Sequence, residues 1–246
     1  MNRKYRKPIM VANWKMNKTP TETTIYIEQL WELIAQLRRS TVVICPPAVC
    51  IPAAVSAARR TRIQIGADNC HMERCGAYTG EISAEMYQDA GCDYVVLESS
   101  VEEASQTRRK LRSVLDAGMR PILCLKDHDR GQGDDSWTVA FMLGQILRDL
   151  PRGKIRNLIV AYAPSVSDST ESSSWIDAQC GFIRTFLRKR YSARDAQLIP
   201  VLYAGDPSAE MARILLSQKN IDGCLVYLAG LKPEAFADLI ATVEPL

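Results

Sequence analysis

Short apolar runs recur along the chain, and segments with a helical pattern of apolar positions separate them. The runs lack strict alternation of apolar and polar residues, so both faces of each predicted strand are expected to be buried, as in a parallel sheet. Between the runs, apolar residues return every three or four positions, which predicts amphipathic helices. The eight runs lie at 9–13, 42–45, 63–67, 94–97, 121–125, 158–162, 200–203 and 224–227.

Strand and helix alternate eight times within 246 residues, an order typical of a (β/α)8 barrel. An open doubly wound sheet is the alternative, but it usually has fewer strands and, for dinucleotides, a glycine fingerprint after the first strand. Here the segment 13–17 (NWKMN) follows the first strand without a glycine. No linker or break in composition divides the chain. The sequence therefore predicts an α/β fold, a single TIM-barrel domain over residues 1–246.

Several helix ends can be predicted from local residue patterns. The segment 206–208 (DPS) fits a helix start with the aspartate as N-cap and proline at the first helical position. Ser100 and Glu103 fit a capping box that starts the helix after the fourth strand. Gly91 and Gly118 are each expected to end a helix just before the next strand.

Composition narrows the classes of partner. The chain is 47% hydrophobic and 24% charged, with a net charge of +3, as expected for a globular protein with a sizeable core. Basic residues at 3–7 are interpreted as a solvated end, and no basic stripe with interleaved aromatics follows, so no nucleic-acid partner is expected. No apolar run is long enough to span a membrane, and the start of the chain does not resemble a signal peptide.

The cysteines indicate a reduced compartment. Several of the eight lie inside apolar runs, where a cysteine behaves as a small hydrophobic residue, and none forms a C-x-x-C pair. Cys70 and Cys75, with His71 between them, do not have the spacing of a zinc ribbon. We therefore expect a cytoplasmic protein without a metal site or another cofactor.

In a barrel, function is located at the carboxyl ends of the strands. Lys15, just after the first strand, could attract an anion or polarise a carbonyl, or it could be an ordinary solvated lysine; spacing alone does not decide. Polar or bulky residues also follow other strands. The candidates for ligand binding are Asn13, Lys15, Ser99, Asp206 and Tyr227, and the candidates for catalysis are Lys15, Glu98 and Lys126.

Two long motifs resemble the triosephosphate isomerase family. The segment 11–17 (VANWKMN) is similar to the opening of that family, and 66–86 (GADNCHMERCGAYTGEISAEM) is similar to its third loop. The segments CDYVVLESS, PILCL, VAYAP, VLYAGD and IDGCLV follow in the family's order. The resemblance covers essentially the whole chain. It implies a (β/α)8 barrel and a proton shuttle between aldose and ketose phosphates by a glutamate base, a neutral histidine and a lysine.

Two of those three chemical groups are missing from the matching positions. The resemblance assigns the lysine to Lys15 and the neighbouring asparagine to Asn13, and both are present. The histidine position is Ser99, and the position of the glutamate base is Ala163. A methyl group cannot abstract a proton, and a serine hydroxyl is a poor substitute for an imidazole. His128, after the fifth strand, remains a possible substitute, whereas His71 lies in the third loop.

The resemblance also implies changes in the lid and in the phosphate-binding loops. The family's glycine-hinged lid corresponds to 165–175 (SVSDSTESSSW), which has no glycine. Asp206 replaces a small residue after the seventh strand and is expected to repel a phosphate. Tyr227 and Leu228 replace a glycine pair after the eighth strand, where backbone N–H groups normally approach the phosphate. Lys126 replaces a glycine after the fifth strand.

These departures favour a homologue without isomerase activity that binds a small-molecule ligand or a partner. One alternative is an enzyme of changed chemistry on a small carbonyl or sugar-derived substrate, using Lys15, Glu98 and Lys126. Lys126 could form a Schiff base if burial lowered its pKa, or it could be a plain ion-pair partner. Residual aldose–ketose isomerase activity is another alternative, and so is a metal site formed by Glu98, Asp127 and Asp206.

The third loop is intact although the active site is not. In the family this loop reaches into the partner subunit, and here the corresponding residues are Thr79, Gly80 and Glu81. The resemblance therefore implies a homodimer formed through loop 75–83. The alternative is a monomer that has kept the loop.

Overall fold

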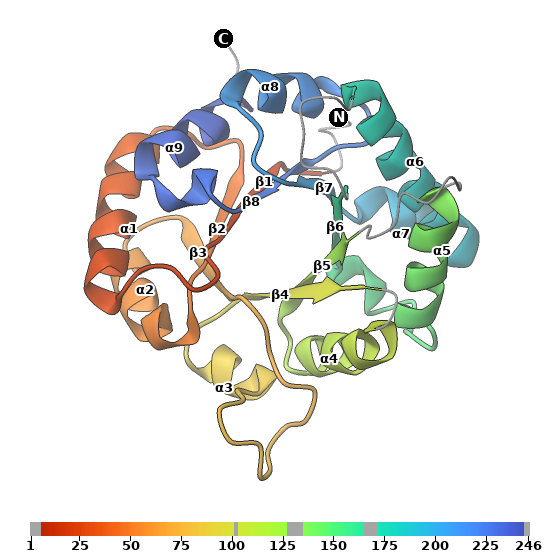
Figure 1. The fold of residues 1–246 in the computed structure, drawn as a ribbon, viewed down its shortest axis with the longest axis horizontal. Coiled ribbons are helices and arrows are strands. Elements are labelled where there is room, and N and C mark those ends of the chain that lie inside the picture. The colour runs from red at the N-terminus through yellow and green to blue at the C-terminus, as the bar shows by residue number, and fades with distance from the viewer. Residues whose placement is uncertain (1–5, 101–102, 127–134, 165–171, 244–246) are drawn as a thin grey trace.

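The predicted barrel is confirmed. The computed structural model describes residues 6–100, 103–126, 135–164 and 172–243. In this part of the chain, eight parallel strands form one closed barrel in chain order (Figure 1). The strands are β1 (Ile9–Asn13), β2 (Thr41–Cys45), β3 (Ile63–Ala67), β4 (Tyr94–Ser99), β5 (Arg120–Lys126), β6 (Ile159–Ala163), β7 (Val201–Ala204) and β8 (Gly223–Val226).

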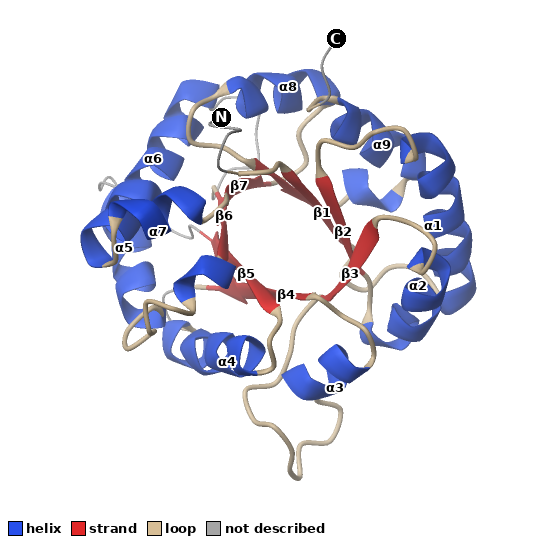
Figure 2. Ribbon diagram, turned by 180° about the vertical axis from the view of Figure 1, so that it is seen from behind, coloured by secondary structure: helices blue, strands red, loops and turns tan. Residues whose placement is uncertain are grey.

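Helices surround the strands on the outside (Figure 2). Of these helices, none that the described residues form is long and apolar enough to cross a bilayer. Short 3-10 turns, η1 (Ala48–Cys50), η2 (Ile155–Asn157) and η3 (Ala229–Leu231), complete the connections. The α-helices are α1 (Pro20–Ile34), α2 (Ile51–Ala58), α3 (Ala84–Asp89), α4 (Ala104–Asp116), α5 (Asp135–Ile146), α6 (Ser173–Arg190), α7 (Ala193–Leu198), α8 (Ala209–Ser217) and α9 (Pro233–Ala241).

Alternation along each strand creates two cores. In β4, Tyr94 and Val96 belong to the cluster inside the barrel, whereas Val95 and Leu97 belong to the layer between strands and helices. Side chains that share a strand face repeat every second residue. The same period carries Glu98 toward the inside of the barrel, at the end of β4.

The barrel closes where β8 pairs with β1. Ile9 lies opposite Gly223 in this pair. A Cβ atom added at Gly223 would lie 1.8 Å from the backbone oxygen of Ile9. The two ends of the sheet can meet at this distance only because residue 223 has no side chain.

A buried ion cluster lies at the amino-terminal end of the barrel. Nε of Arg6 lies 2.7 Å from Oδ1 of Asp222, whose side chain is fully buried. Arg184 pairs with Oδ2 of the same carboxylate and also donates to the backbone oxygens of Asn220 and Ile199, at 2.9 and 3.1 Å. The cluster therefore ties the entry to β1 to helix α6 and to the entry to β8.

The predicted helix starts are only partly correct. Helix α4 begins at Ala104, so Ser100 is not its N-cap; the Ser100 hydroxyl instead donates to Oε2 of Glu103 at 3.2 Å. The N-cap of α8 is Ser208, which accepts the N–H of Met211 at 3.2 Å. Asp206 was the wrong choice because its carboxylate accepts backbone N–H groups after β8.

The predicted glycine ends are confirmed. Gly91 follows α3 with φ 99° and Gly118 follows α4 with φ 80°, a left-handed conformation that favours glycine.

The loop after β3 projects from the barrel beside α3 (Figure 1). Its base is closed where the N–H of His71 donates to the oxygen of Ile82 at 2.7 Å. The rings of His71 and Tyr78 lie 4.2 Å apart, and the N–H of Glu81 donates to the oxygen of Tyr78 at 3.1 Å. Internal contacts therefore order this loop, although most of its side chains are exposed.

Candidate functional site

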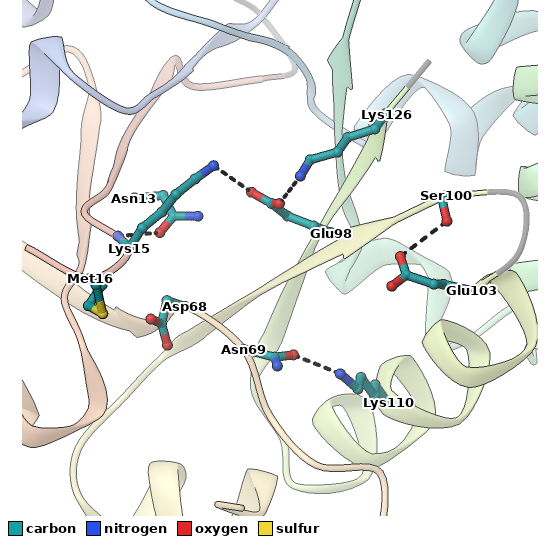
Figure 3. A pocket seen from close by; sticks show the side chains of 10 residues that line it. All are labelled: Asn13, Lys15, Met16, Asp68, Asn69, Glu98, Ser100, Glu103, Lys110 and Lys126. Carbon is teal, nitrogen blue, oxygen red and sulfur yellow. Dashed lines mark hydrogen bonds and ion pairs between the residues drawn. The ribbon is translucent and has the colours of Figure 1, made fainter. Parts of the chain in front are cut away.

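A polar cavity of about 670 Å³ opens at the carboxyl-terminal end of the barrel, which we call the mouth (Figure 3). Residues from the ends of β1, β3, β4 and β5 and from α4 meet there. The lining residues are Asn13, Lys15, Met16, Asp68, Asn69, Glu98, Ser100, Glu103, Lys110 and Lys126.

Glu98 lies between two lysines at the centre of this site (Figure 3). Nζ of Lys126 forms an ion pair with Oε2 of Glu98, and Nζ of Lys15 lies 3.8 Å from Oε1. All three candidate catalytic residues are thus brought together. The single carboxylate is matched by two ammonium groups.

The ion pair with Glu98 bears on the two interpretations of Lys126. Burial alone lowers this pKa, but the hydrogen bond and the charge of Glu98 outweigh burial, and the net shift is upward. A Schiff-base lysine needs a lowered pKa so that its amine is neutral. The geometry therefore favours a plain ion pair over a nucleophilic lysine.

Lys15 is held in an unusual backbone conformation. Its φ is 50°, a left-handed value that costs a residue with a side chain about 1–2 kcal/mol. The Lys15 N–H donates to Oδ1 of Asn13 at 3.2 Å, which stabilises this turn. Nζ lies 4.2 Å from the ring centre of Tyr227, a cation–π contact. Lys15 is therefore fixed by Asn13, Glu98 and Tyr227 together.

Asp68 is a site residue that the sequence interpretation missed. Burial raises the pKa of its carboxyl group, the backbone N–H groups of Asp68 and Asn69 oppose this, and the charge of Glu98 raises it further. Beside it, Asn69 Oδ1 accepts from Nζ of Lys110 at 2.9 Å. Asp68 directly follows β3, so the strand-end rule could have found it. Lys110 lies within a helix, and no local signal marked it.

Tyr227 and Asp206 lie outside the lining of this cavity, on the β7–β8 side of the mouth. Tyr227 packs against the cluster inside the barrel, and its hydroxyl lies 3.7 Å from Sγ of Cys124. Oδ1 of Asp206 accepts the N–H groups of Tyr227 and Ala229, at 2.8 and 3.1 Å. The side chain of Leu228, the other residue that replaces the glycine pair, is exposed.

The two substituted positions are both near the mouth but differ in environment. Ser99 is 1% exposed, and its hydroxyl donates to the oxygen of Ser100 at 3.2 Å; it does not line the cavity. Ala163 ends β6 opposite Lys126 in the strand register and packs against the cluster inside the barrel. The strand end next to Lys126 thus carries a methyl group at residue 163.

Some candidates cannot be placed. Asp127 and His128 lie outside the described residues, as do 165–171 of the predicted lid. His71 is described, and its Nδ1 accepts the N–H of Glu73 at 3.2 Å, away from the cavity lining. In the described part of the chain, no three His, Cys, Asp or Glu side chains are grouped so that they could hold a metal ion.

Comparison with known proteins identifies the family to which this chain belongs. The family model described as triosephosphate isomerase matches residues 8–243. The chain belongs to the triosephosphate isomerase family. The match begins just before β1 and ends just after α9, so every element that contributes to the mouth lies inside it.

Individual triosephosphate isomerases support this assignment over the whole chain. The enzyme of Dictyoglomus thermophilum is 32% identical and that of Solibacter usitatus 31%; each match covers 96% of this chain and 99% of the relative. The crystal structure of triosephosphate isomerase from Bartonella henselae aligns with a TM-score of 0.86 at 26% identity, covering 96% of this chain and 98% of that one.

Proposed function

We propose that this protein is a triosephosphate isomerase homologue that lacks isomerase activity and binds a small ligand or a protein partner at its mouth. The observation that carries the proposal is Ala163. In the resemblance it occupies the position of the glutamate base, and in the structure its methyl group faces the cluster inside the barrel.

The other charged groups of the mouth do not supply a replacement for this base. Both oxygens of the Glu98 carboxylate are engaged in ion pairs, one with Lys126 and one with Lys15. The upward shift of the pKa of Lys126 keeps its amine protonated at neutral pH. These features disfavour both residual isomerisation and Schiff-base chemistry.

An isomerase assay tests the proposal directly. We expect no turnover of glyceraldehyde 3-phosphate above background, with the D. thermophilum relative assayed in parallel as the positive control. A kcat/KM within about a hundredfold of that relative, a difference of about 2.7 kcal/mol in barrier, would refute the proposal.

Borohydride treatment tests the alternative of changed chemistry. With small carbonyl compounds present, it should leave Lys126 and Lys15 unmodified; an adduct would support that alternative.

Native mass spectrometry of freshly purified protein separates ligand binding from partner binding. A retained small molecule, lost in Glu98→Gln, would place a ligand in the cavity. The matched control is Glu210→Gln, an exposed position in α8. Absence of any small molecule would favour the partner-binding form of the proposal.

We infer that the protein is a homodimer through loop 75–83. Thr79, Gly80 and Glu81 are exposed on the projecting loop. Met16, at the rim of the cavity, is 95% exposed, and Tyr78 is 46% exposed. Both apolar side chains are available for burial against a partner subunit. The acidic Glu81 also complements the charge of Lys110, whose Nζ donates to the neutral side chain of Asn69.

Sedimentation at micromolar concentration tests the dimer. We expect a dimer for the unmodified chain and for the control Glu210→Lys, and a monomer for Thr79→Arg. A monomeric unmodified chain would contradict the inference.

We also propose a cytoplasmic location, which is supported by the eight cysteines, all of them free thiols.

A further inference from the structure

The β7–β8 side of the mouth is filled by the protein itself. A carboxylate oxygen of Asp206 accepts two backbone N–H groups, those of Tyr227 and Ala229, at 2.8 and 3.1 Å. The N–H of Gly205 also donates to the oxygen of Leu225 at 3.0 Å. These bonds hold the loop after β7 against the loop after β8 and place an anionic group where the two loops meet.

The same bonds position the side chain of Tyr227 over the barrel. Its ring packs on the cluster inside the barrel, lies under Nζ of Lys15 at 4.2 Å, and directs its hydroxyl to Sγ of Cys124 at 3.7 Å. Cys124 is fully buried. The ring is therefore the layer of atoms between this side of the mouth and the interior.

We propose that Asp206 and Tyr227 form an internal substitute for a bound ligand: the carboxylate takes the place of a ligand's anionic group, and the tyrosine ring takes the place of its carbon skeleton. We call this pair the Tyr227–Asp206 closure. The inference rests on the proposed function and narrows it. A ligand of this mouth is confined to the cavity beside Glu98 and carries no phosphate bound by the loops after β7 and β8.

Charge supports this restriction. An anion approaching the N–H groups of Tyr227 and Ala229 finds them already bonded and meets the negative charge of Asp206. The anion and the carboxylate of Asp206 would repel each other. The anion would also have to displace the two hydrogen bonds that Asp206 accepts. The closure thus selects against phosphorylated ligands without altering Lys15 or Asn13.

Cysteine labelling tests the closure because Cys124 lies beneath it. Burial raises the pKa of Cys124 to about 12, so both access and ionisation limit its reaction. Native protein is treated with iodoacetamide, and each cysteine is quantified by peptide mass spectrometry. Exposed Cys75 serves as the reactive reference. The buried references, which lie in or near other strands and α6, are Cys45, Cys180 and Cys224.

Tyr227→Gly should expose Cys124 selectively. We expect its labelling to accelerate about tenfold or more, because both access and the thiolate fraction increase, while the three buried references stay slow. Tyr227→Phe is the matched control; it keeps the ring, and Cys124 should stay protected. The proposal is overturned if Cys124 in Tyr227→Gly remains as slow as Cys180, or if Tyr227→Phe labels as fast as Tyr227→Gly.

Asp206→Ser provides a second reading that does not depend on removing a packed ring. The position is exposed, and loss of the carboxylate should release Tyr227 and raise labelling of Cys124 alone.

A phosphate titration tests the anion part of the proposal. The double variant Asp206→Ser, Tyr227→Gly should show a saturable rise in thermal midpoint with inorganic phosphate, and the unmodified protein should not. An equal response in both proteins would refute the claim that the Tyr227–Asp206 closure keeps anions from the loops after β7 and β8. Isomerase activity would refute the proposed function, yet it would leave these labelling results unchanged.

Discussion

Glu98 and Lys126 form an ion pair at the ends of the neighbouring strands β4 and β5, and the carboxylate keeps the pKa of the lysine above its ordinary value. In Glu98→Gln the raising charge is gone and burial remains, so the pKa of Lys126 should fall. Acylation of Lys126 by acetic anhydride near neutral pH should become faster, as measured by peptide mass spectrometry. Exposed Lys189 in the same sample is the internal control. An unchanged rate at Lys126 would show that Glu98 does not govern its proton.

The same pair predicts how stability depends on pH. The pKa of Lys126 is raised from 10.5 in the folded protein, so its contribution is present below that value and is lost as the pH rises through the folded pKa. The difference in unfolding free energy between the unmodified protein and Glu98→Gln should therefore be steady between about pH 7 and 9 and shrink above about pH 11. Urea titrations at these pH values measure it. A difference that persists unchanged in strong base would contradict the assignment.

Asp68 should be a source of instability at neutral pH. Its pKa is raised from 3.8 mainly by burial, so the fold favours the protonated form and loses stability as the pH rises through the folded pKa. Asp68→Asn keeps an oxygen that accepts the backbone N–H groups and removes the charge. We expect this variant to be more stable than the unmodified protein at neutral pH, with the two converging as the pH falls toward 3.8. Equal urea midpoints at neutral pH would be evidence against this.

Asp222 should be among the most sensitive positions for stability. It is fully buried between Arg6 and Arg184, and removing one member of a buried ion cluster typically costs about 3–5 kcal/mol. Asp222→Asn should lower the unfolding free energy by an amount of that order. Lys154→Ala, which breaks an exposed pair with Asp116, should change it by less than about 1 kcal/mol. Similar losses in the two variants would show that burial is not the deciding factor.

Gly223→Ala should prevent normal closure of the barrel. The new methyl group would overlap the backbone oxygen of Ile9, which cannot move without breaking the β1–β8 pairing. We expect insoluble protein or a large fall in thermal midpoint. Gly144→Ala is the matched control, because no atom lies within 4 Å of its added Cβ and alanine favours a helix by about 1 kcal/mol. Soluble Gly223→Ala with an unaltered midpoint would rule out this steric account.

The sequence was sufficient for the barrel because apolar strand cores leave a strong local signal. The predicted run 9–13 coincides with β1, and 63–67 coincides with β3. Capping was predicted less well, since Ser208 and Asp206 are both plausible N-caps and only the tertiary bonds of Asp206 decide between them. The rule that barrel sites lie at the carboxyl ends of strands predicted that Glu98 reaches the mouth, as it does.

The composition of the cavity was harder to predict, because it depends on distances between elements. Lys110 reaches the site from α4 through Asn69, and no spacing in the sequence joins those residues. The sequence also did not show that the side chain of Tyr227 packs inside the barrel whereas that of Leu228 is exposed. Adjacent side chains after a strand point in different directions, and only the bonds to Asp206 fix which one turns inward.

The pairing of Ile9 with Gly223 has a consequence for synthesis of the chain. The first strand and the last strand are neighbours in the barrel, although 213 positions separate them in the sequence (223 − 9 − 1). While the ribosome is still making the later residues, β1 lacks one of its two partners and presents an unpaired apolar edge. Such edges promote aggregation, and contacts distant in sequence form slowly. The barrel can therefore close only after the last strand has been made, and incomplete chains should aggregate more readily than the full chain.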